Sequence, residues 1–280
     1  MKNDLKGVID IHIHIGPEAY KKRKYNEYTL AQEASDAGAR ALVMKAHIFE
    51  TATRAKVAQE KFPNIQLFGG IALNEEVGGL NAAAVRAVAD LGGKIVWFPT
   101  LAARHEKQQM GKEGGICCFE EGSRDKLSKA CESVLNVIAE KQLVLATGHI
   151  SIPEQIAVVR EAHNLGIKHI LINHPTLFRI GMDVRTQESL LKYGVIFERN
   201  YGGSRLPESK VFEKHFERNL RDIRYLGAES SIMATDLGQP FNCGWAEGFQ
   251  EYIDFMYDHG VSEKDIDLMT RKNPAALLEI

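Results

Sequence analysis

The stretch V-I-D-I-H-I-H-I at Val8–Ile15 decides the expected fold of this chain. Its strict alternation of apolar and polar side chains is the period-two pattern of a β-strand with two different faces. One face carries isoleucines that would pack on helices, and the other carries Asp10, His12 and His14. Buried imidazoles need polar partners, and one metal ion can satisfy both, although a pair of hydrogen-bonded core histidines is the alternative.

Seven further apolar runs follow the first, with helical patterns between them. This alternation indicates parallel strands joined by helical crossovers. Eight such units in a chain of 280 residues predict the α/β class and a closed (β/α)8 barrel, or TIM barrel. The expected strands are Val8–Ile15, Ala41–His47, Ile65–Leu73, Lys94–Thr100, Leu143–His149, His169–Pro175, Val195–Tyr201 and Ser231–Leu237.

An open doubly wound sheet is the alternative fold. It is disfavoured because His14-Ile15-Gly16-Pro17 follows the first strand where a Gly-rich phosphate loop would be expected. The expected helices are Leu30–Gly38, Thr51–Phe62, Asn81–Leu91, Asp125–Lys141, Pro153–Leu165, Thr186–Tyr193 and Pro207–Leu226. One long loop, Leu101–Ser123, follows the fourth strand and would form either a lid or substrate wall or a flexible surface excursion.

Composition favours one domain that acts on a small molecule. No Pro-rich, Ser-rich or charged linker divides the chain, so residues 1–280 are expected to form a single barrel. With 35 basic and 37 acidic side chains, the net charge of -2 gives no reason to expect nucleic acid or an anionic membrane as partner. No signal peptide or membrane-spanning segment is recognised, which predicts a cytoplasmic protein. The sequence leaves open whether the chain forms a homo-oligomer.

Three more ligand-type side chains end expected strands. His149 closes the fifth strand, His174 the sixth and Asp236 the eighth. Barrel active sites are built at the carboxyl ends of the strands, so these side chains should meet His12 and His14 at one rim. Each alone could be a capping or core polar residue, but together they predict a metal site.

On these residues the sequence resembles the amidohydrolase superfamily, across essentially the whole chain and including the terminal segment Asn273–Leu278. In detail it resembles a poorly characterised, barrel-only branch. The resemblance implies that His12 and His14 bind a buried metal with Asp236. It also implies that His149 binds the first or a second metal, and that His174 binds a second metal or polarises the substrate.

The fourth strand departs from the two-metal pattern of this superfamily. It offers Trp97, Phe98 and Pro99 where a carboxylated Lys or a Glu usually bridges two metals. Lys45, on the second strand, is the candidate replacement as a carboxylated metal ligand, and the alternative is that it is a cation that binds substrate. His47, on the same face, is expected to be a ligand, an acid or a hydrogen-bond donor to a ligand.

The expected function is metal-dependent hydrolysis of an amide, ester, lactone or related bond in a small molecule. One or two divalent cations would activate water while Asp236 moves the proton, with His174, His47 and Lys45 as further catalytic candidates. Zinc is favoured by the imidazole-rich ligand set, with Mn2+ or Fe2+ as alternatives. A decarboxylase or isomerase, or a non-catalytic metal- or metabolite-binding barrel, remain alternatives. The candidate substrate contacts, which would suit an anionic substrate, are Arg104, His105, Arg179, Arg199, Asn200, Tyr201 and Arg205, and a solvated surface position is the alternative for each arginine.

Overall fold

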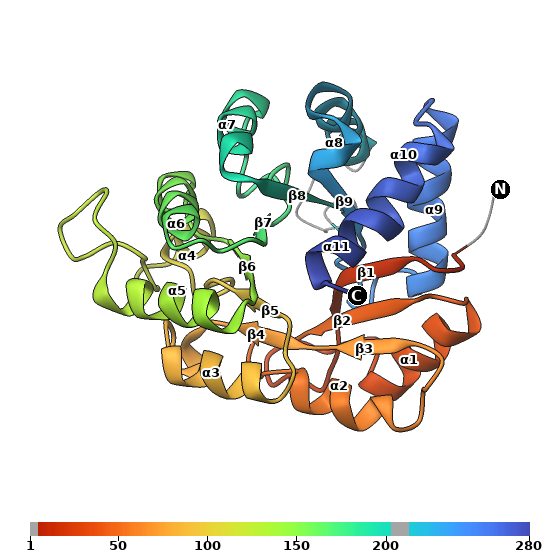
Figure 1. Cartoon of the computed structure of the whole chain (residues 1–280), viewed down its shortest axis with the longest axis horizontal. Coiled ribbons are helices and arrows are strands. Elements are labelled where there is room, and N and C mark those ends of the chain that lie inside the picture. Colours follow the sequence, from red (N-terminus) through yellow and green to blue (C-terminus); the bar gives the residue numbers. More distant parts are fainter. Residues whose placement is uncertain (1–4, 203–212) are drawn as a thin grey trace.

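The first strand, β1 (Ile9–His14), is buried along its whole length. In the computed structural model, which describes residues 5–202 and 213–280, β1 pairs in parallel with β2 (Ala41–Lys45). β2 pairs in turn with β3 (Gln66–Phe68). Six more parallel strands continue the order, each bonded to the next (Figure 1). They are β4 (Gly70–Ala72), β5 (Ile95–Trp97), β6 (Val144–Ala146), β7 (Ile170–Ile172), β8 (Val195–Asn200) and β9 (Ser231–Ala234).

All eight expected strands are present, because β3 and β4 are two halves of the run Ile65–Leu73, separated at Gly69. A Cβ at Gly69 would lie 2.2 Å from the carbonyl carbon of Thr51, so only glycine fits at this break. The Thr51 hydroxyl also donates to the carbonyl of Met44 in β2 and accepts from the N–H of Gly70. The two halves therefore keep their places in one continuous wall.

The first and last strands close the wall into a barrel. The His14 N–H donates to the carbonyl of Leu237, and the Asp236 N–H donates to the carbonyl of His12, both at 2.8 Å. These bonds join β1 to the residues that directly follow β9. In an open sheet, β1 and β9 would lie at opposite edges and could not be joined in this way. The predicted (β/α)8 barrel is confirmed.

A β-bulge in β1 changes which side chains face the barrel interior. Asp10 lies opposite Leu42 and Ile13 opposite Met44, so Ile11 and His12 together face the single residue Val43. The expected strict alternation is therefore wrong at this point, because a bulge inserts one unpaired residue and reverses the faces beyond it.

The reversal separates Asp10 from the two histidines. Its carboxylate turns outward and accepts a hydrogen bond from Nε1 of Trp245 at 2.9 Å. Ile11 instead joins the apolar cluster inside the barrel, whereas Ile13 packs with the helices outside. The bulge thus puts an apolar layer below His12 and His14, which stay on the interior face.

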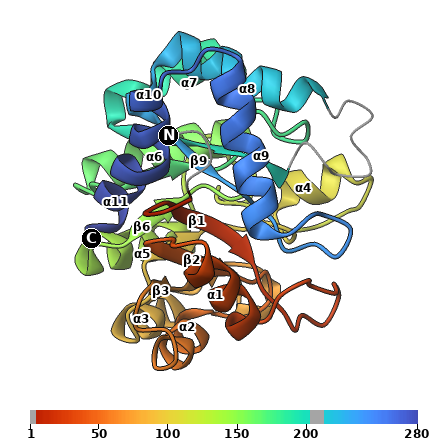
Figure 2. The same cartoon turned by 90° about the vertical axis from the view of Figure 1, so that its right-hand side faces the viewer.

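Helices cover the outside of the barrel. In both Figure 1 and Figure 2, α1 and α2 lie outside β1–β3. Helix α6 begins as expected, since Ser151 and Glu154 form a capping box. The first residues of the expected helix Pro207–Leu226 lie outside the described residues. The helices are α1 (Glu27–Asp36), α2 (Ala52–Gln59), α3 (Ala82–Asp90), α4 (Arg104–Gln109), α5 (Lys129–Lys141), α6 (Ile152–Asn164), α7 (Val184–Leu190), α8 (Glu213–Leu226), α9 (Trp245–Asp258), α10 (Glu263–Asp267) and α11 (Asn273–Leu278), with short turns η1 (Glu75–Val77), η2 (Leu191–Tyr193), η4 (Ala228–Ser230) and η5 (Leu268–Lys272).

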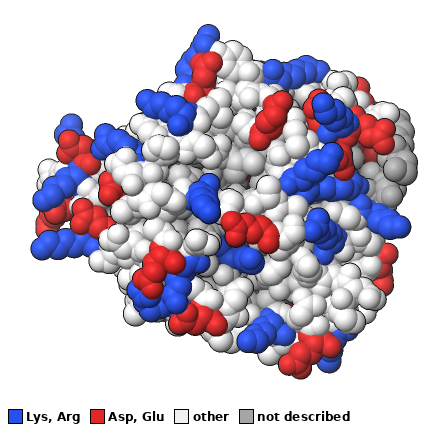
Figure 3. Space-filling view, in the orientation of Figure 1, with Lys and Arg blue, Asp and Glu red and all other residues white. Residues whose placement is uncertain are grey.

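On the face of the molecule that Figure 3 shows, acidic and basic side chains are interspersed without a large area of one sign. This agrees with the nearly balanced composition. Among the described residues, no helix combines the length and the apolar character needed to cross a bilayer.

Candidate active site

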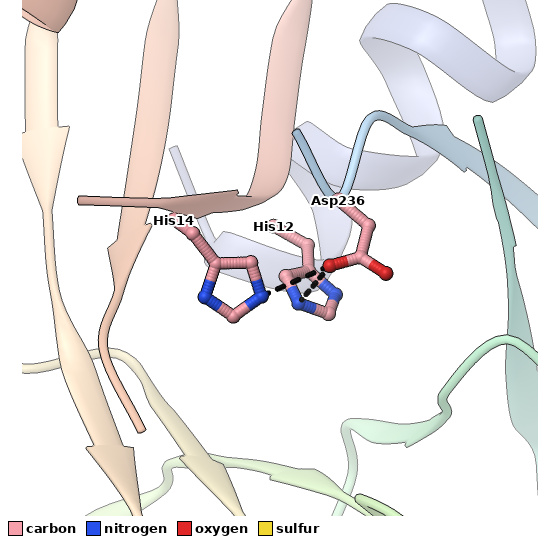
Figure 4. Close-up of side chains that lie close together, drawn as sticks. All are labelled: His12, His14 and Asp236. Carbon is pink, nitrogen blue, oxygen red and sulfur yellow. Dashed lines mark hydrogen bonds and ion pairs between the residues drawn. The ribbon is translucent and has the colours of Figure 1, made fainter. Parts of the chain in front are cut away.

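His12, His14 and Asp236 meet at the carboxyl end of the barrel strands. Oδ1 of Asp236 lies 3.0 Å from Nε2 of His14 and 3.2 Å from Nε2 of His12. One ligand-type atom from each residue lies within 4.8 Å of the others, and Figure 4 shows both rings directed toward the carboxylate. Asp236 has φ +52, and Gly238 allows the turn because a Cβ there would lie 2.1 Å from the carbonyl oxygen of His14.

Glu198 contacts Nδ1 of His12, the ring nitrogen on the other side from the one beside Asp236. Its Oε1 lies 2.9 Å from Nδ1 of His12, and its Oε2 accepts a hydrogen bond from Nδ2 of Asn173 at 2.7 Å. Burial favours the neutral imidazole, but the Glu198 carboxylate and Asp236 outweigh it and raise the pKa of His12 to about 9. The sequence analysis missed Glu198. The signal was available, because a charged residue in a run expected to be a buried strand needs a partner.

Lys45 lies directly beside these atoms. Its Nζ is 3.0 Å from Nε2 of His12 and 5.1 Å from the centre of the Trp97 ring. The side chain is buried, and burial lowers the pKa of the ammonium group to about 8. A residue near its own pKa can be neutral, which is the condition for a lysine to tolerate a neighbouring cation or to be carboxylated.

His47 borders the same site. Its ring centre lies 4.6 Å from that of His14, and Nδ1 hydrogen-bonds Oγ1 of Thr100 at 2.9 Å. Burial, followed by the repulsion that His14 would exert if it were protonated, holds the pKa of His47 well below its usual range. His47 is therefore a neutral imidazole at the cavity wall.

His149 and His174 lie opposite, with ring centres 4.9 Å apart. The His174 ring is 6.0 Å from that of His12, so these side chains do meet at one rim. Within the described residues, however, only His12, His14 and Asp236 form a close group of metal-ligand type. His149, His174 and Lys45 surround that group.

The long loop after the fourth strand contributes a buried carboxylate that the sequence analysis missed. The loop contains α4, and Glu106 of α4 is fully buried. Its Oε2 lies 3.3 Å from Nδ1 of His149, and its Oε1 lies 3.0 Å from Nε of Arg179. Burial would raise the pKa of Glu106, but His149 and Arg179 lower it to about 2. The loop therefore forms part of the wall of the site.

The donor set fits a divalent cation. Burial holds the pKa of His14 and His174 well below the usual value, so both rings are neutral. Nδ1 of His14 and Nδ1 of His174 are buried without a hydrogen-bond partner. Burial would raise the pKa of Asp236, but His12 and His14 hold it far below its usual range and keep it ionised. His14 supplies a neutral imidazole and Asp236 an ionised carboxylate, which are the forms in which these side chains bind metal, and His12, whose pKa is raised to about 9, would release its proton on binding the cation.

A cavity of about 340 Å³ opens on this group. It exposes His14 and Asp236 of the group to a small molecule, while the apolar barrel layer lies below them. The lining residues are His14, Lys21, Lys22, Arg23, Lys45, His47, Leu101, His149, His174, Leu177, Arg179, Asp236, Gln239, Pro240 and Phe241.

Of the expected substrate contacts on the loops, Arg179 lines the cavity. His105 does not, but its Nε2 lies 2.8 Å from the Arg179 carbonyl and supports that residue. Arg104 is exposed at the start of α4 and is absent from the lining. Arg205 lies outside the described residues.

The prediction that Arg199 and Tyr201 contact the substrate is wrong. Arg199 is fully buried between helices, with Nη1 donating to Oε1 of Gln187 at 2.8 Å and lying 3.6 Å from Asp222. Tyr201 is fully buried and donates to Glu251 at 2.6 Å. Both alternate with Glu198 and Asn200 along β8, so they point outward while Glu198 and Asn200 point inward. Asn200 does reach the site and donates from Nδ2 to Oδ2 of Asp236 at 2.9 Å.

Solved structures of metal-dependent and other hydrolases share this fold. An amidohydrolase from Pseudomonas aeruginosa aligns with a TM-score of 0.67 at 11% identity, covering 98% of this chain and 96% of that one. A structure described as dipeptidase AC, a metallopeptidase, gives 0.65 at 13% identity, covering 99% and 98%. An organophosphorus hydrolase from Deinococcus radiodurans gives 0.59 at 14%, covering 97% and 92%.

These likenesses show that the chain shares its fold with structures described as an amidohydrolase and a metallopeptidase. No curated protein matches the sequence. A family model matches residues 7–198, well over half of the chain. The chain therefore belongs to that family, which is described as a family of unknown function, DUF6282.

Proposed function

We propose that this chain is a metal-dependent hydrolase whose single barrel domain, residues 1–280, acts on a small molecule. The observation that carries the proposal is the close, buried group of His12, His14 and Asp236 at the floor of a cavity of about 340 Å³. A divalent cation held by these residues would lower the pKa of a water molecule and polarise the scissile amide, ester or lactone. The enzymes that share the fold support the same reaction class.

Asp236 is proposed to move the proton. Its carboxylate is ionised at neutral pH, so Oδ1 or Oδ2 can accept a proton from the attacking water. Asn200 donates to Oδ2 and orients the group. The same carboxyl group then returns the proton to the leaving nitrogen or oxygen, which leaves Asp236 ionised for the next turnover.

His174 and His149 are proposed to bind the substrate at the reacting bond. Both rings are buried, and burial lowers the pKa of each, so they are neutral hydrogen-bond donors rather than fixed charges. A neutral imidazole can donate to a carbonyl oxygen that gains negative charge in the transition state. Oε2 of Glu106, 3.3 Å from Nδ1 of His149, is proposed to orient that ring. His47 is proposed to keep His14 in position through their ring contact.

Zinc is the proposed metal, since two imidazoles and one carboxylate suit it, and one ion per chain is the proposed count. β5 (Ile95–Trp97) supplies apolar side chains where a bridging ligand would be required. Lys45 is proposed to contact the substrate. A second ion bridged by a carboxylated Lys45 is the alternative, and the position of Nζ beside His12 is compatible with it.

The test combines metal analysis with product analysis. The protein as purified is expected to contain one equivalent of zinc, and mass spectrometry should find Lys45 unmodified. Turnover on a panel of amides, esters and lactones should stop on chelation and return with zinc. In water labelled with heavy oxygen, the label must enter the product.

Turnover without label incorporation would show a decarboxylase or isomerase and would refute the hydrolase proposal. Tight binding of a panel compound without turnover would show a non-catalytic barrel. Two metal equivalents with a carboxylated Lys45 would overturn only the single-metal assignment, and the hydrolase proposal would stand.

A further inference from the structure

The mouth of the cavity is strongly basic. Among the described lining residues, Asp236 is the one acidic side chain, and it is engaged by His12 and His14. The basic lining residues are Lys21, Lys22, Arg23, Lys45 and Arg179. The first three of these come from the segment that follows β1, in the run K-K-R-K at Lys21–Lys24, which the sequence analysis did not use.

Arg23 is a buried cation with an unused donor. Its side chain is 2% exposed, and its Nε pairs with Oε2 of Glu18 at 2.5 Å. Its Nη2 is buried and has no hydrogen-bond partner among the described residues. A charged donor left without a partner is costly, so this atom marks a place where a ligand can supply the missing acceptor.

Gly16 fixes the position of Arg23. A Cβ at Gly16 would lie 2.8 Å from Cβ of Arg23, so the arginine stem packs against bare backbone. Glu18 is held as well, because its Oε1 accepts from the backbone N–H of His47 at the edge of the metal group. The Glu18–Arg23 pair is therefore built into the wall of the cavity and is not a flexible surface contact.

Lys21 and Lys22 extend the positive region outward. Both are exposed and line the same cavity. Partial loss of hydration, followed by the charge of Arg23, lowers the pKa of Lys21, which indicates that these cations crowd one another. Arg179 contributes less, because Glu106 already pairs with its Nε at 3.0 Å.

We infer that the cavity takes a substrate with an anionic oxygen group, a carboxylate or a phosphate, which accepts a hydrogen bond from Nη2 of Arg23 and is attracted by Lys21 and Lys22. The anion site deepens the proposed function, and the statement that the bound molecule is a substrate rests on that function. Binding of the anion itself does not depend on hydrolysis. The anionic end would lie at the basic segment after β1, and the scissile group would extend to Asp236.

The test is anion binding by isothermal titration calorimetry to the zinc-loaded protein. Glutarate and inorganic phosphate are the two anionic probes, and glutaramide is the neutral counterpart of glutarate. The variants are Arg23→Gln and the double variant Lys21→Gln/Lys22→Gln, which leaves the buried Glu18 pair intact. Lys24→Gln is the matched control, because it removes the adjacent exposed positive charge outside the cavity lining.

We expect at least one anion to bind and glutaramide not to bind. Arg23→Gln and the double variant should each weaken that binding about tenfold or more, with unchanged zinc content, whereas Lys24→Gln should not. Tighter glutarate binding would identify a carboxylate substrate, and tighter phosphate binding a phosphorylated one. Binding that is equal in all variants, or no binding of either anion, would overturn the inference.

The two proposals fail separately. If the protein holds no zinc and hydrolyses nothing, but loses anion binding in Arg23→Gln, the hydrolase proposal fails and the anion site stands. If zinc-dependent hydrolysis is found but neutral compounds react as well as matched anionic ones in both the wild type and Arg23→Gln, only the anion inference fails.

Discussion

Glu198 and His12, which are 186 positions apart, form the contact that fixes the orientation of the metal group: Oε1 of Glu198 accepts from Nδ1 of His12 at 2.9 Å. With the proton held on Nδ1, the ring presents Nε2 toward Asp236 and the proposed cation. Carboxylates in this position commonly set both the tautomer and the basicity of a metal-binding histidine.

Glu198→Gln should weaken zinc binding about 10- to 100-fold. The amide keeps the size of the side chain but removes the charge that stabilises the His12 imidazole. Zinc affinity is measured by competition with a chelator of known affinity. Glu76→Gln, which changes an exposed acid of η1, is the control and should bind zinc as the wild type does. Equal affinity in Glu198→Gln and wild type would show that this contact does not tune the site.

Asp236→Asn should keep most of the bound zinc and lose turnover about 100-fold or more. The two histidines remain as ligands and the amide oxygen still lies beside them, but the amide cannot accept the proton of the attacking water. Zinc content and turnover on the best compound of the panel are measured on the same preparation. Asp90→Asn, at an exposed position, serves as control. Activity retained in Asp236→Asn would refute the role of this residue as base.

Glu106→Gln should lower both stability and turnover without removing zinc. Glu106 is the buried ionic partner of Arg179 and lies beside the neutral ring of His149, and loss of its charge leaves Arg179 uncompensated. The free energy of unfolding should fall by about 2 to 3 kcal/mol, measured by urea denaturation. Glu113→Gln changes an exposed acid in the same loop and should alter neither quantity. Normal turnover in a destabilised Glu106→Gln would limit the role of this residue to the fold.

His215 should make the protein less stable as the pH falls from 6.5 toward 4. The side chain is buried and its Nε2 donates to the carbonyl of Asn200 at 2.9 Å. Burial lowers its pKa from 6.5 to about 4, so between these values the unfolded chain binds the proton and the folded chain does not. Stability is therefore lost on acidification, by about 1 to 2 kcal/mol between pH 7 and pH 5 from this residue.

The measurement for His215 is urea denaturation of the wild type and His215→Gln at both pH values. The variant should lose less stability on acidification by that amount, even if it is less stable at pH 7. Other buried histidines, such as His47 and His174, titrate in the same direction in both proteins, so the difference between the two isolates His215. An identical pH dependence in wild type and variant would contradict the prediction.

The sequence by itself determined the barrel and the residues that gather at its rim. Strand-length apolar runs and intervening helical patterns are local properties, and parallel strands in one barrel must end at the same rim. His12, His14, His149, His174 and Asp236 could therefore be brought together from their positions alone.

The tertiary structure decided which neighbours each of these side chains has. Alternation along Val195–Asn200 puts Glu198 and Arg199 on opposite faces, but no local pattern says which face is inside. The bulge that turns Asp10 outward depends on how β1 pairs with β2. Glu106 and Arg23 reach the cavity from connecting segments, whose paths are set by packing over the finished barrel. A few consecutive residues are enough to show a periodic pattern. Contacts between residues far apart in the chain, in contrast, form only when the whole core packs together.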